Sequence, residues 1–263
     1  MSNIISTGMH GMLAQNEKLN WIGHNIANMR TPGYRSHDTF LAEMSRHSDT
    51  GSEQAPGVTA KGVSVNWSAS TPTDTDRPTD LAIQGEGMFP VVQGGKTFFT
   101  RAGNFSFNRN DDRSGFVLSR PTGERLADST GNEISFGDIP ANFSISPNGA
   151  FQEMGTASPS VPEVRLQLFA NPETLRSVGN GLYEASTQTI NHEGQSVQSQ
   201  PKAPVEPGAN GSGQLRQGAL ETSNVELVNE FSNLLQAQRI YQANSRAVST
   251  GNKMLQNAIQ NLL

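Results

Sequence analysis

The C-terminal stretch of the chain, residues 227–263, decides the fold and reads LVNEFSNLLQAQRIYQANSRAVSTGNKMLQNAIQNLL. Its large apolar residues recur every seven positions, at Leu227, Leu234, Tyr241, Val248, Leu255 and Leu262. A companion position four residues later holds Phe231 and Ile259 at its ends and Gln238, Ser245 and Asn252 between them. Such a heptad repeat is typical of a coiled coil, so the sequence predicts one helix of about 35–40 residues. Ser223 and Glu226 fit a capping box at its start.

The N-terminal end carries a second heptad pattern, at Ile5, Met12, Leu19 and Ile26. It predicts a helix that stops before Thr31, because Pro32 pushes the residue before it out of the α region. A helix with an apolar seam must bury that seam, and each large side chain so buried contributes roughly 1.5–3 kcal/mol. The obvious partner is the other terminal helix, in a parallel or an antiparallel orientation.

Both predicted helices carry few charges. Residues 221–263 hold only Glu221, Glu226, Glu230, Arg239, Arg246 and Lys253. Small and amide side chains, which suit close helix contact, fill much of the remaining surface. We therefore expect neighbouring subunits to enclose both helices, with the polar seam residues fixing the register. The alternative is a monomer closed by a terminal helical hairpin.

Between the two helices the sequence has the pattern of β-structure. Short runs at 81–83, 88–92, 97–100 and 164–169 are separated by turn clusters such as Gly179-Asn180-Gly181. This spacing predicts a central, mostly antiparallel β domain and an α+β fold in which the terminal helices pair as a coiled-coil-like domain. The predicted divisions are an N-terminal helix at 1–34, an extended linker region at 35–75, the β domain at 76–205, a linker at 206–221 and a C-terminal helix at 222–263.

Composition and motifs exclude several classes of protein. The net charge of −5 argues against a general nucleic-acid binder, and the absence of cysteine excludes disulfides and thiolate sites. We expect neither a membrane span nor a cleavable signal peptide. The histidines lack metal-ligand spacing, and Asp74, Asp76 and Asp80 lack the rest of an EF-hand loop. No catalytic motif is present, so no catalytic residue, cofactor or metal is predicted.

Four motifs follow one another along the chain. Asn25-Ile26-Ala27-Asn28 and Thr31-Pro32-Gly33-Tyr34-Arg35 are similar to the signature N-[LI]-A-N-x-x-T-x-G-[FY]-[KR]. Residues 80–89 (DLAIQGEGMF) and 100–105 (TRAGNF) follow, and residues 218–224 (GALETSN) precede the C-terminal helix. Their order resembles that of the bacterial flagellar rod and hook family of axial proteins. The C-terminal motifs are most similar to those of distal rod members.

The resemblance implies a structural protein rather than an enzyme. Family members are exported through the flagellar type III export apparatus and polymerise helically into the hollow rod that crosses the periplasm. Their terminal helices form the inner tube, with the β domain outside. The implied partners are further copies of the chain, other rod proteins, the hook protein, the P and L ring bushing and the export apparatus. No nucleic acid, membrane insertion or cofactor is implied.

Within this picture two groups of residues form the predicted assembly interface. A packing stripe comprises Ile5, Met12, Leu19, Ile26, Leu227, Phe231, Leu234, Tyr241, Val248, Leu255 and Ile259. The turn after the first helix comprises Asn25, Asn28, Thr31 and Gly33. For each stripe residue the alternative is a role in the core of its own subunit.

Two departures from the family pattern leave alternatives open. His24 stands where the family often has a small polar residue, and the segment 42–75 is shorter than is typical of distal rod proteins. That short segment would suit the proximal rod protein, whereas the C-terminal motifs favour the distal one. Outside the family, a secreted wall-acting enzyme and a phage-tail-like fibre or adhesin remain as rival classes.

Overall fold

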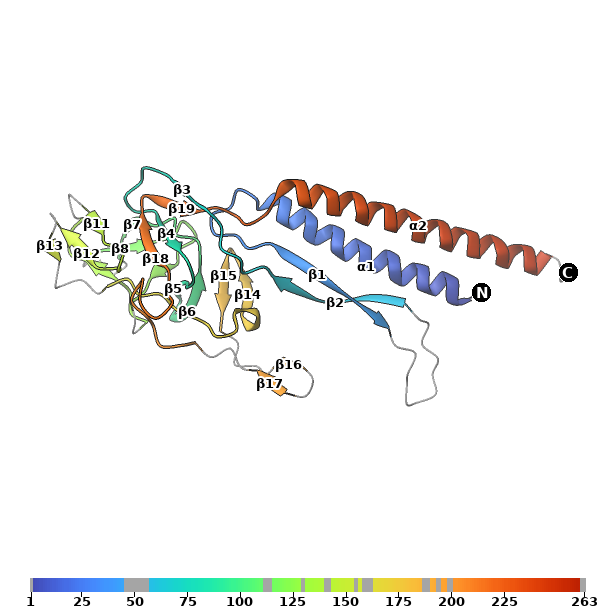
Figure 1. Cartoon of the computed structure of the whole chain (residues 1–263), viewed down its shortest axis with the longest axis horizontal. Coiled ribbons are helices and arrows are strands. Elements are labelled where there is room, and N and C mark those ends of the chain that lie inside the picture. Colours follow the sequence, from blue (N-terminus) through green and yellow to red (C-terminus); the bar gives the residue numbers. More distant parts are fainter. Residues whose placement is uncertain are drawn as a thin grey trace. The chain divides into compact units, whose positions relative to one another are not determined.

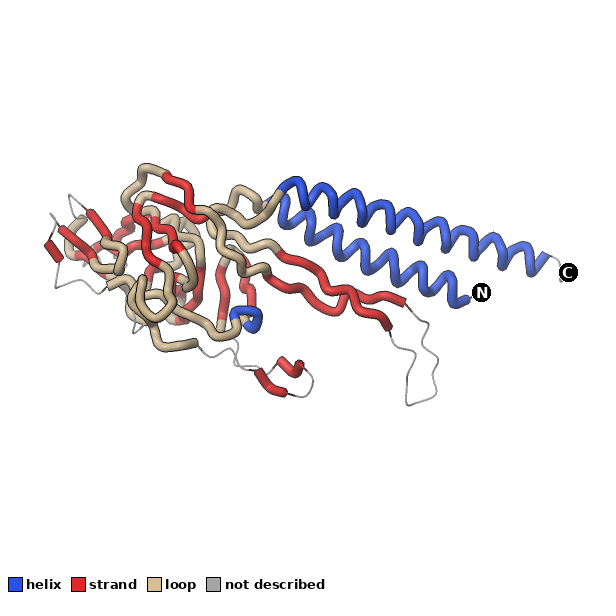
Figure 2. Tube along the Cα trace, in the orientation of Figure 1, coloured by secondary structure: helices blue, strands red, loops and turns tan. Residues whose placement is uncertain are grey.

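The computed structural model describes residues 2–44, 57–110, 115–128, 131–139, 143–153, 156–157, 163–185, 190–192, 195–197 and 201–260. The chain forms two compact units. The helix unit consists of Met1–Met29, Ser36–Asn66 and Val225–Leu263, and the β unit consists of Arg30–Arg35 and Trp67–Asn224. The helices and strands of both are shown in Figures 1 and 2.

The helix unit contains two long helices and one strand pair. Its elements are α1 (Ser2–Ala27), β1 (His37–Met44), β2 (Gly57–Val65) and α2 (Leu227–Gln260). Helix α1 packs against α2 and also against the antiparallel pair β1–β2, as Figure 1 shows. The predicted pairing of the terminal helices is thus confirmed.

The ends of the helices differ in detail from the prediction. Helix α1 stops at Ala27, ahead of Thr31 as expected, while α2 has 34 residues and begins only at Leu227. The first helical bond joins the Glu230 N–H to the Glu226 carbonyl at 3.0 Å. Ser223 therefore lies outside the helix and the predicted capping box is wrong. Its carbonyl instead accepts a bond from the Ser70 hydroxyl.

The β unit is built on an eight-stranded sheet with antiparallel pairing. Its order is β10–β8–β9–β5–β6–β15–β14, and β7 also pairs with β8. These strands are β5 (Phe89–Gln93), β6 (Lys96–Thr100), β7 (Ser106–Arg109), β8 (Phe116–Ser119), β9 (Arg125–Leu126), β10 (Ser135–Phe136), β14 (Arg176–Gly179) and β15 (Leu182–Glu184). The short 3-10 helix η1 (Pro172–Thr174) precedes β14.

Smaller ladders complete the β unit. The strand β18 (Gln214–Gln217) pairs with β4 (Leu81–Gln84), and β19 (Ala219–Glu221) pairs with β3 (Pro72–Asp74). A three-stranded sheet and a separate pair are formed by β11 (Phe143–Ile145), β12 (Phe151–Glu153) and β13 (Thr156–Ala157), and by β16 (Ile190–His192) and β17 (Gln195–Val197). All these pairs are antiparallel.

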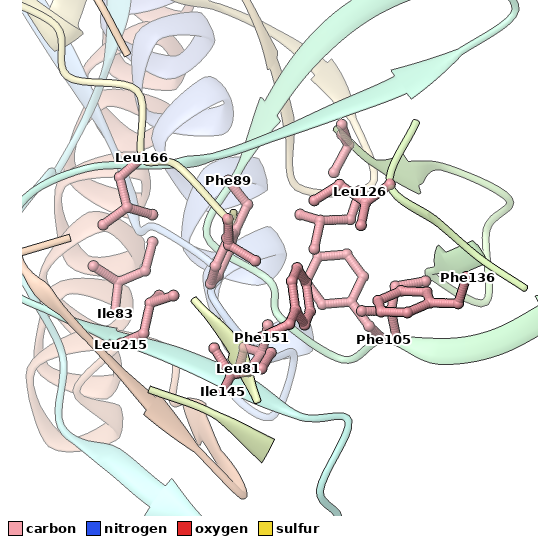
Figure 3. Close-up of a cluster of buried hydrophobic side chains, with 14 of the residues drawn as sticks. Leu81, Ile83, Phe89, Phe105, Leu126, Phe136, Ile145, Phe151, Leu166 and Leu215 are labelled. Carbon is pink, nitrogen blue, oxygen red and sulfur yellow. The ribbon is translucent and has the colours of Figure 1, made fainter. Parts of the chain in front are cut away.

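One apolar cluster forms the core of the β unit (Figure 3). Leu81 and Ile83 of β4, Phe89 of β5 and Phe105 are all nearly inaccessible to solvent. Aromatic rings meet edge to face, as in the 5.6 Å contact between Phe89 and Phe105, an arrangement that their quadrupoles favour. The central runs that alternate with glycine turns therefore supply the core strands, as the sequence predicts.

Three predicted segments look different in the structure. Residues 164–169 form single-residue bridges, among them Leu166 with Val205, instead of a strand. The segment predicted as an extended linker, 35–75, contains the strand pair β1–β2. The predicted linker 206–221 contains β18 and β19, because each complements the exposed edge of an earlier short strand.

Candidate assembly interface

Glycines lie at the points where α1 and α2 come closest together in the seam between them. A Cβ atom added to Gly8 would lie 2.6 Å from Cγ2 of Val248, and one added to Gly11 would lie 2.5 Å from Nδ2 of Asn244. On the opposite helix, a Cβ at Gly251 would lie 3.0 Å from Cγ1 of Ile5. Residues nearer the start of α1 thus meet residues nearer the end of α2, so the helices run antiparallel. Their close approach excludes larger side chains at these points.

The predicted stripe residues of α2 do not all lie on the side that packs against α1. Leu227, Leu234, Val248 and Leu255 are half-buried, as seam residues should be. The companion row of the seam lies three residues later, with Glu230, Ala237 and Gly251 buried and Asn244 and Ala258 half-buried.

The companion position predicted four residues after each seam residue is therefore wrong as part of the helix pair. Phe231 and Ile259 are 50% and 59% exposed, and Tyr241, which belongs to the heptad row itself, is 40% exposed. Gln238, Ser245 and Asn252 are exposed as well. The row that contains Ala237 and Gly251 completes the seam, because these small residues let the two helix backbones approach closely. As contacts to other subunits, the exposed residues stay a prediction.

The N-terminal half of the stripe is half-buried throughout, at Ile5, Met12, Leu19 and Ile26. The deepest side chains of α1 are others, namely Ala14, Ile22 and Asn25. Because α1 is covered both by α2 and by β1–β2, its buried surface is wider than one heptad stripe. The heptad alone therefore underestimates how much of this helix is enclosed.

Asn25 joins three elements of the helix unit. Its Nδ2 donates to the His37 carbonyl at 2.8 Å and to Oε1 of Glu230 at 2.9 Å, while its Oδ1 accepts from the His37 N–H at 2.9 Å. The side chain is only 2% exposed. Trp21, one turn earlier, stacks on the His37 ring at 4.9 Å. Asn25 thus fixes α1 to the start of β1 and to α2, rather than forming the predicted turn.

Paired glycine substitutions test the seam. We expect Gly8→Ala to destabilise the helix unit, because the added methyl group meets Val248, by about 1–3 kcal/mol. Gly23→Ala is the matched control, since nothing lies within 4 Å of its added Cβ. Replacing an exposed helical glycine should stabilise α1 by about 0.5–1 kcal/mol. Thermal unfolding followed by circular dichroism measures both, and equal shifts in the two variants would contradict the close seam.

Glu230 makes the helix pair sensitive to pH. Burial raises the pKa of its carboxyl group above the ordinary value and Asp38 adds to this, while the bond from Asn25 and the charge of Lys18 oppose it. A carboxyl group whose pKa is raised on folding makes the folded state less stable as the pH rises through that pKa.

We therefore expect Glu230→Gln to be more stable than the wild type near neutral pH. This difference should shrink as the pH falls toward the ordinary pKa of glutamate. Melting curves of both proteins across that range provide the measurement. A constant difference at every pH would show that the titration of Glu230 does not contribute.

Large apolar side chains remain exposed on the helix unit. On α2 they include Val228 (72% exposed) and Leu235 (55%), in addition to Phe231 and Ile259. Helix α1 contributes Ile4, Met9 and Leu13, and β1 contributes Phe40. Exposed apolar residues gathered on one unit indicate a surface made for protein contact.

The other residues predicted for the turn after the first helix are Asn28, Thr31 and Gly33. Asn28 closes α1, donating from Nδ2 to the His24 carbonyl at 2.9 Å. Thr31 accepts a turn bond from the Tyr34 N–H. Gly33, in the β unit, has a φ of +67°, and a Cβ added there would lie 2.5 Å from the Ala102 nitrogen. Only glycine combines that backbone conformation with so close an approach.

Two arginines and one glutamate form a buried network in the β unit. Nη2 of Arg35 lies 2.6 Å from Oε1 of Glu221, and neither side chain is accessible to solvent. Nη1 of Arg101 lies 3.4 Å from Oε2 of the same carboxylate. The Ser70 N–H also donates to Glu221, while Arg35 and Arg101 donate to the carbonyls of Ser68 and Gly85.

Burial shifts the protonation equilibria around this network. It lowers the pKa of Arg101 to about 10, because removal from water disfavours the charged form, while Glu221 partly offsets the effect and Arg35 adds to it. Burial also raises the pKa of Tyr183 to about 12, against the opposing charge of Arg35. Arg101 thus keeps its positive charge at neutral pH.

The network brings together the four motifs singled out in the sequence. Arg35 ends the first motif, Gly85 lies in the second, Arg101 in the third and Glu221 in the fourth. The sequence predicted no role for either arginine or for the glutamate, although the motifs that contain them stand out in it. The signal in the sequence that could have pointed to the network is the presence of charged residues within motifs that are otherwise polar or apolar.

The described parts of the chain contain no group of three metal-ligating side chains placed to hold a metal ion. No helix among the described residues has the length and apolar character of a membrane span.

Comparison with known proteins finds relatives that match nearly the whole length of the chain. Three family models match in order: "Flagella basal body rod protein" at residues 5–35, "Flagellar hook protein FlgE/F/G D1 domain" at 82–152 and "Flagellar basal body rod FlgEFG protein C-terminal" at 216–261. The chain is 30% identical to the flagellar basal-body rod protein FlgG of Bacillus subtilis, with 98% of each chain covered. It is 32% identical to FlgG of Caulobacter vibrioides, with 96% of each covered. With FlgF of the latter species it shares 25% identity over 100% of this chain and 98% of the relative.

Proposed function

The chain belongs to the family of flagellar basal-body rod proteins, and on that premise we propose that its copies stack through the helix unit into the hollow drive shaft of the flagellum. It is a structural subunit of the basal-body rod, and the FlgG relatives favour the distal rod over the proximal one. Membership implies assembly with other rod and hook proteins. Contacts with the P and L ring bushing and passage through the type III export apparatus are part of the proposal.

The observation that carries this proposal is the exposed apolar surface of the helix unit. Each such side chain would gain roughly 1.5–3 kcal/mol if it were buried. A head-to-tail contact that does not close into a ring propagates as a helix, so self-association of this unit through such a contact would produce a helical polymer. Torque would then pass through staggered helices packed side by side.

The proposal gives the predicted interface residues two roles. The exposed ones, Phe231, Tyr241 and Ile259, would contact other subunits directly. The half-buried ones, Ile5, Met12, Leu19, Ile26, Leu227, Leu234, Val248 and Leu255, would hold the helix pair and so shape the contact surface. Asn28, Thr31 and Gly33 would form the turn after α1, while Asn25 would hold α1 to β1 and to α2. The divisions at 1–34 and 222–263 would then be the inner-tube domains, with 76–205 outside.

Charged substitutions on α2 test this division. We expect Leu235→Asp to abolish tube formation and leave the fold unchanged, because Leu235 is already exposed in the single subunit. Leu234→Asp should also loosen the helix pair, since its side chain is half-buried in the seam. Gln236→Asp, at an exposed polar position, is the charge-matched control.

Sedimentation and negative-stain electron microscopy of concentrated purified protein would detect tubes, and circular dichroism would report on the fold. Normal tubes from Leu235→Asp would remove the apolar surface of α2 from the interface. Failure of the wild type to form any polymer would contradict assembly through self-association.

A further inference from the structure

The positive charges of α2 are arranged in a single row. Between Phe231 and Gln260 the helix carries Arg239, Arg246 and Lys253 and no acidic residue. The seven-residue spacing places the three cations on one face, about 10 Å apart along the axis. All three are exposed, and none forms an ion pair within the described residues.

This row lies on the side of α2 that faces away from α1. Arg239 follows the seam residues Leu234 and Ala237 by five and two positions, which is about 140° and 200° around the helix. Arg246 and Lys253 repeat that relation in the next two heptads. The exposed positions beside the row are polar or small from Gln236 onward: Gln236, Gln242, Ala243, Ser249, Thr250, Gln256 and Asn257. From Gln236 onward this face therefore lacks large apolar residues, whereas Leu235 and Val228 lie on the same side of the helix nearer its start.

Such a face does not suit a contact between copies of the helix unit. Packed helices lie about 8–10 Å apart, and a buried cation without a partner is strongly unfavourable. The exposed acids described in the unit are Glu17, Asp38 and Glu226, one each from α1, β1 and the residue before α2. They form no row that could match the cations. Within the helix unit no described row of acids could neutralise these cations, so from Gln236 onward a place against water is the favourable one.

We infer that Arg239, Arg246 and Lys253 line the central channel of the assembled rod as an electropositive track for acidic unfolded polypeptide. The inference rests on the proposed function, because a tube of enclosed helices has its inner water surface at the channel. Narrow clefts lined by one sign of charge and walled by low-dielectric material concentrate the field. Repetition of the row in every subunit would extend the track along the tube.

The passing chain best matched to this track has the opposite charge. A copy of this protein carries a net charge of −5, so the subunit itself is suitable cargo. Each contact between exposed charges contributes only about 0.2–1 kcal/mol and is screened by salt. Individual contacts would therefore break easily, and the track would attract a moving polypeptide without trapping it.

The absence of cysteine from the natural sequence makes a thiol-labelling test possible. Arg246→Cys would place a single thiol in the row, and Ser177→Cys would place one at an exposed position of the β unit as a control. Preformed tubes would be treated with an anionic and a cationic methanethiosulfonate of similar size, and separately with a bulky polyethylene-glycol maleimide.

In tubes, Cys at position 246 should react with the small reagents and be protected from the bulky one, while Cys at position 177 should react with all of them. At position 246 the ratio of the anionic to the cationic rate should rise at least about threefold over that of the free subunit, and the rise should disappear in 1 M salt.

Protection of position 246 from the small reagents would place the row between subunits, and reaction with the bulky reagent would place it outside. Loss of tubes from Arg246→Cys alone would likewise assign the row to an interface. Each of these results overturns the inference and leaves the proposed function standing. If the wild type formed no tubes, the proposed function would fail first and the inference with it.

Discussion

Replacing Glu221 with glutamine is expected to lower the free energy of unfolding of the β unit by about 3–5 kcal/mol. The substitution removes the carboxylate that pairs with both Arg35 and Arg101. Arg35 is fully buried and Arg101 is 5% exposed, so neither guanidinium could recover its hydration without opening the fold. Two uncompensated cations would then remain in a low-dielectric region.

Tryptophan fluorescence during urea unfolding can follow this effect. Trp67 lies in the β unit, 4.8 Å from the ring of Tyr183, and Trp21 is the second tryptophan of the chain. A Trp21→Phe background therefore isolates the signal of the β unit. Arg216→Gln is the control, because it breaks an ion pair with Asp74 that is exposed on both sides and should cost at most about 1 kcal/mol.

A second substitution separates the charge effect from a simple loss of packing. Arg35→Met in the Glu221→Gln background removes one of the stranded cations, so the double variant should lose less stability than the two single variants added together. Strict additivity would mean that Arg35 and Glu221 do not act as a pair. A loss equal to that of Arg216→Gln would mean that the network is not closed to solvent.

The elements that could be predicted are those whose residues follow a regular pattern in the sequence. Both terminal helices, their pairing and the antiparallel β region followed from seven-residue spacing and from turn clusters. The heptad could not decide which neighbouring row completes the seam. Phe231 and Ile259 attracted that assignment because they are large and apolar, yet the helices meet through Gly8, Gly251 and Ala237. A pattern of hydrophobic residues does not show where two helices touch because glycine, which has no side chain, lets their backbones come close.

Contacts between distant parts of the sequence were the other gap. Arg35 and Glu221 are separated by 186 positions, and β18 and β19 find their partners in strands more than a hundred residues earlier. Nothing local in a sequence specifies such a pairing. The motifs marked where these residues are, and only the fold shows that they meet. The same holds for Asn25, whose role depends on Glu230 and His37 together.

Gly103→Ala should be the most damaging single-methyl substitution in the β unit. A Cβ atom at this position would lie 1.8 Å from the carbonyl oxygen of Leu81 and 2.8 Å from its carbonyl carbon. The obstacle is backbone, so no change of rotamer can relieve it. Leu81 also donates its N–H to the Gly103 carbonyl at 3.0 Å and begins β4, which pairs with β18.

Making room for the methyl group would therefore displace a core strand, and we expect a loss of about 3 kcal/mol or more. Gly137→Ala is the matched control, since nothing lies within 4 Å of its added Cβ. Both substitutions reduce the freedom of the unfolded chain to a similar extent, so their difference in urea unfolding isolates the clash. Equal stabilities would refute the close approach of Gly103 to Leu81. Because the clash lies within the β unit, the circular dichroism signal of the two long helices should persist after the Trp67 signal is lost.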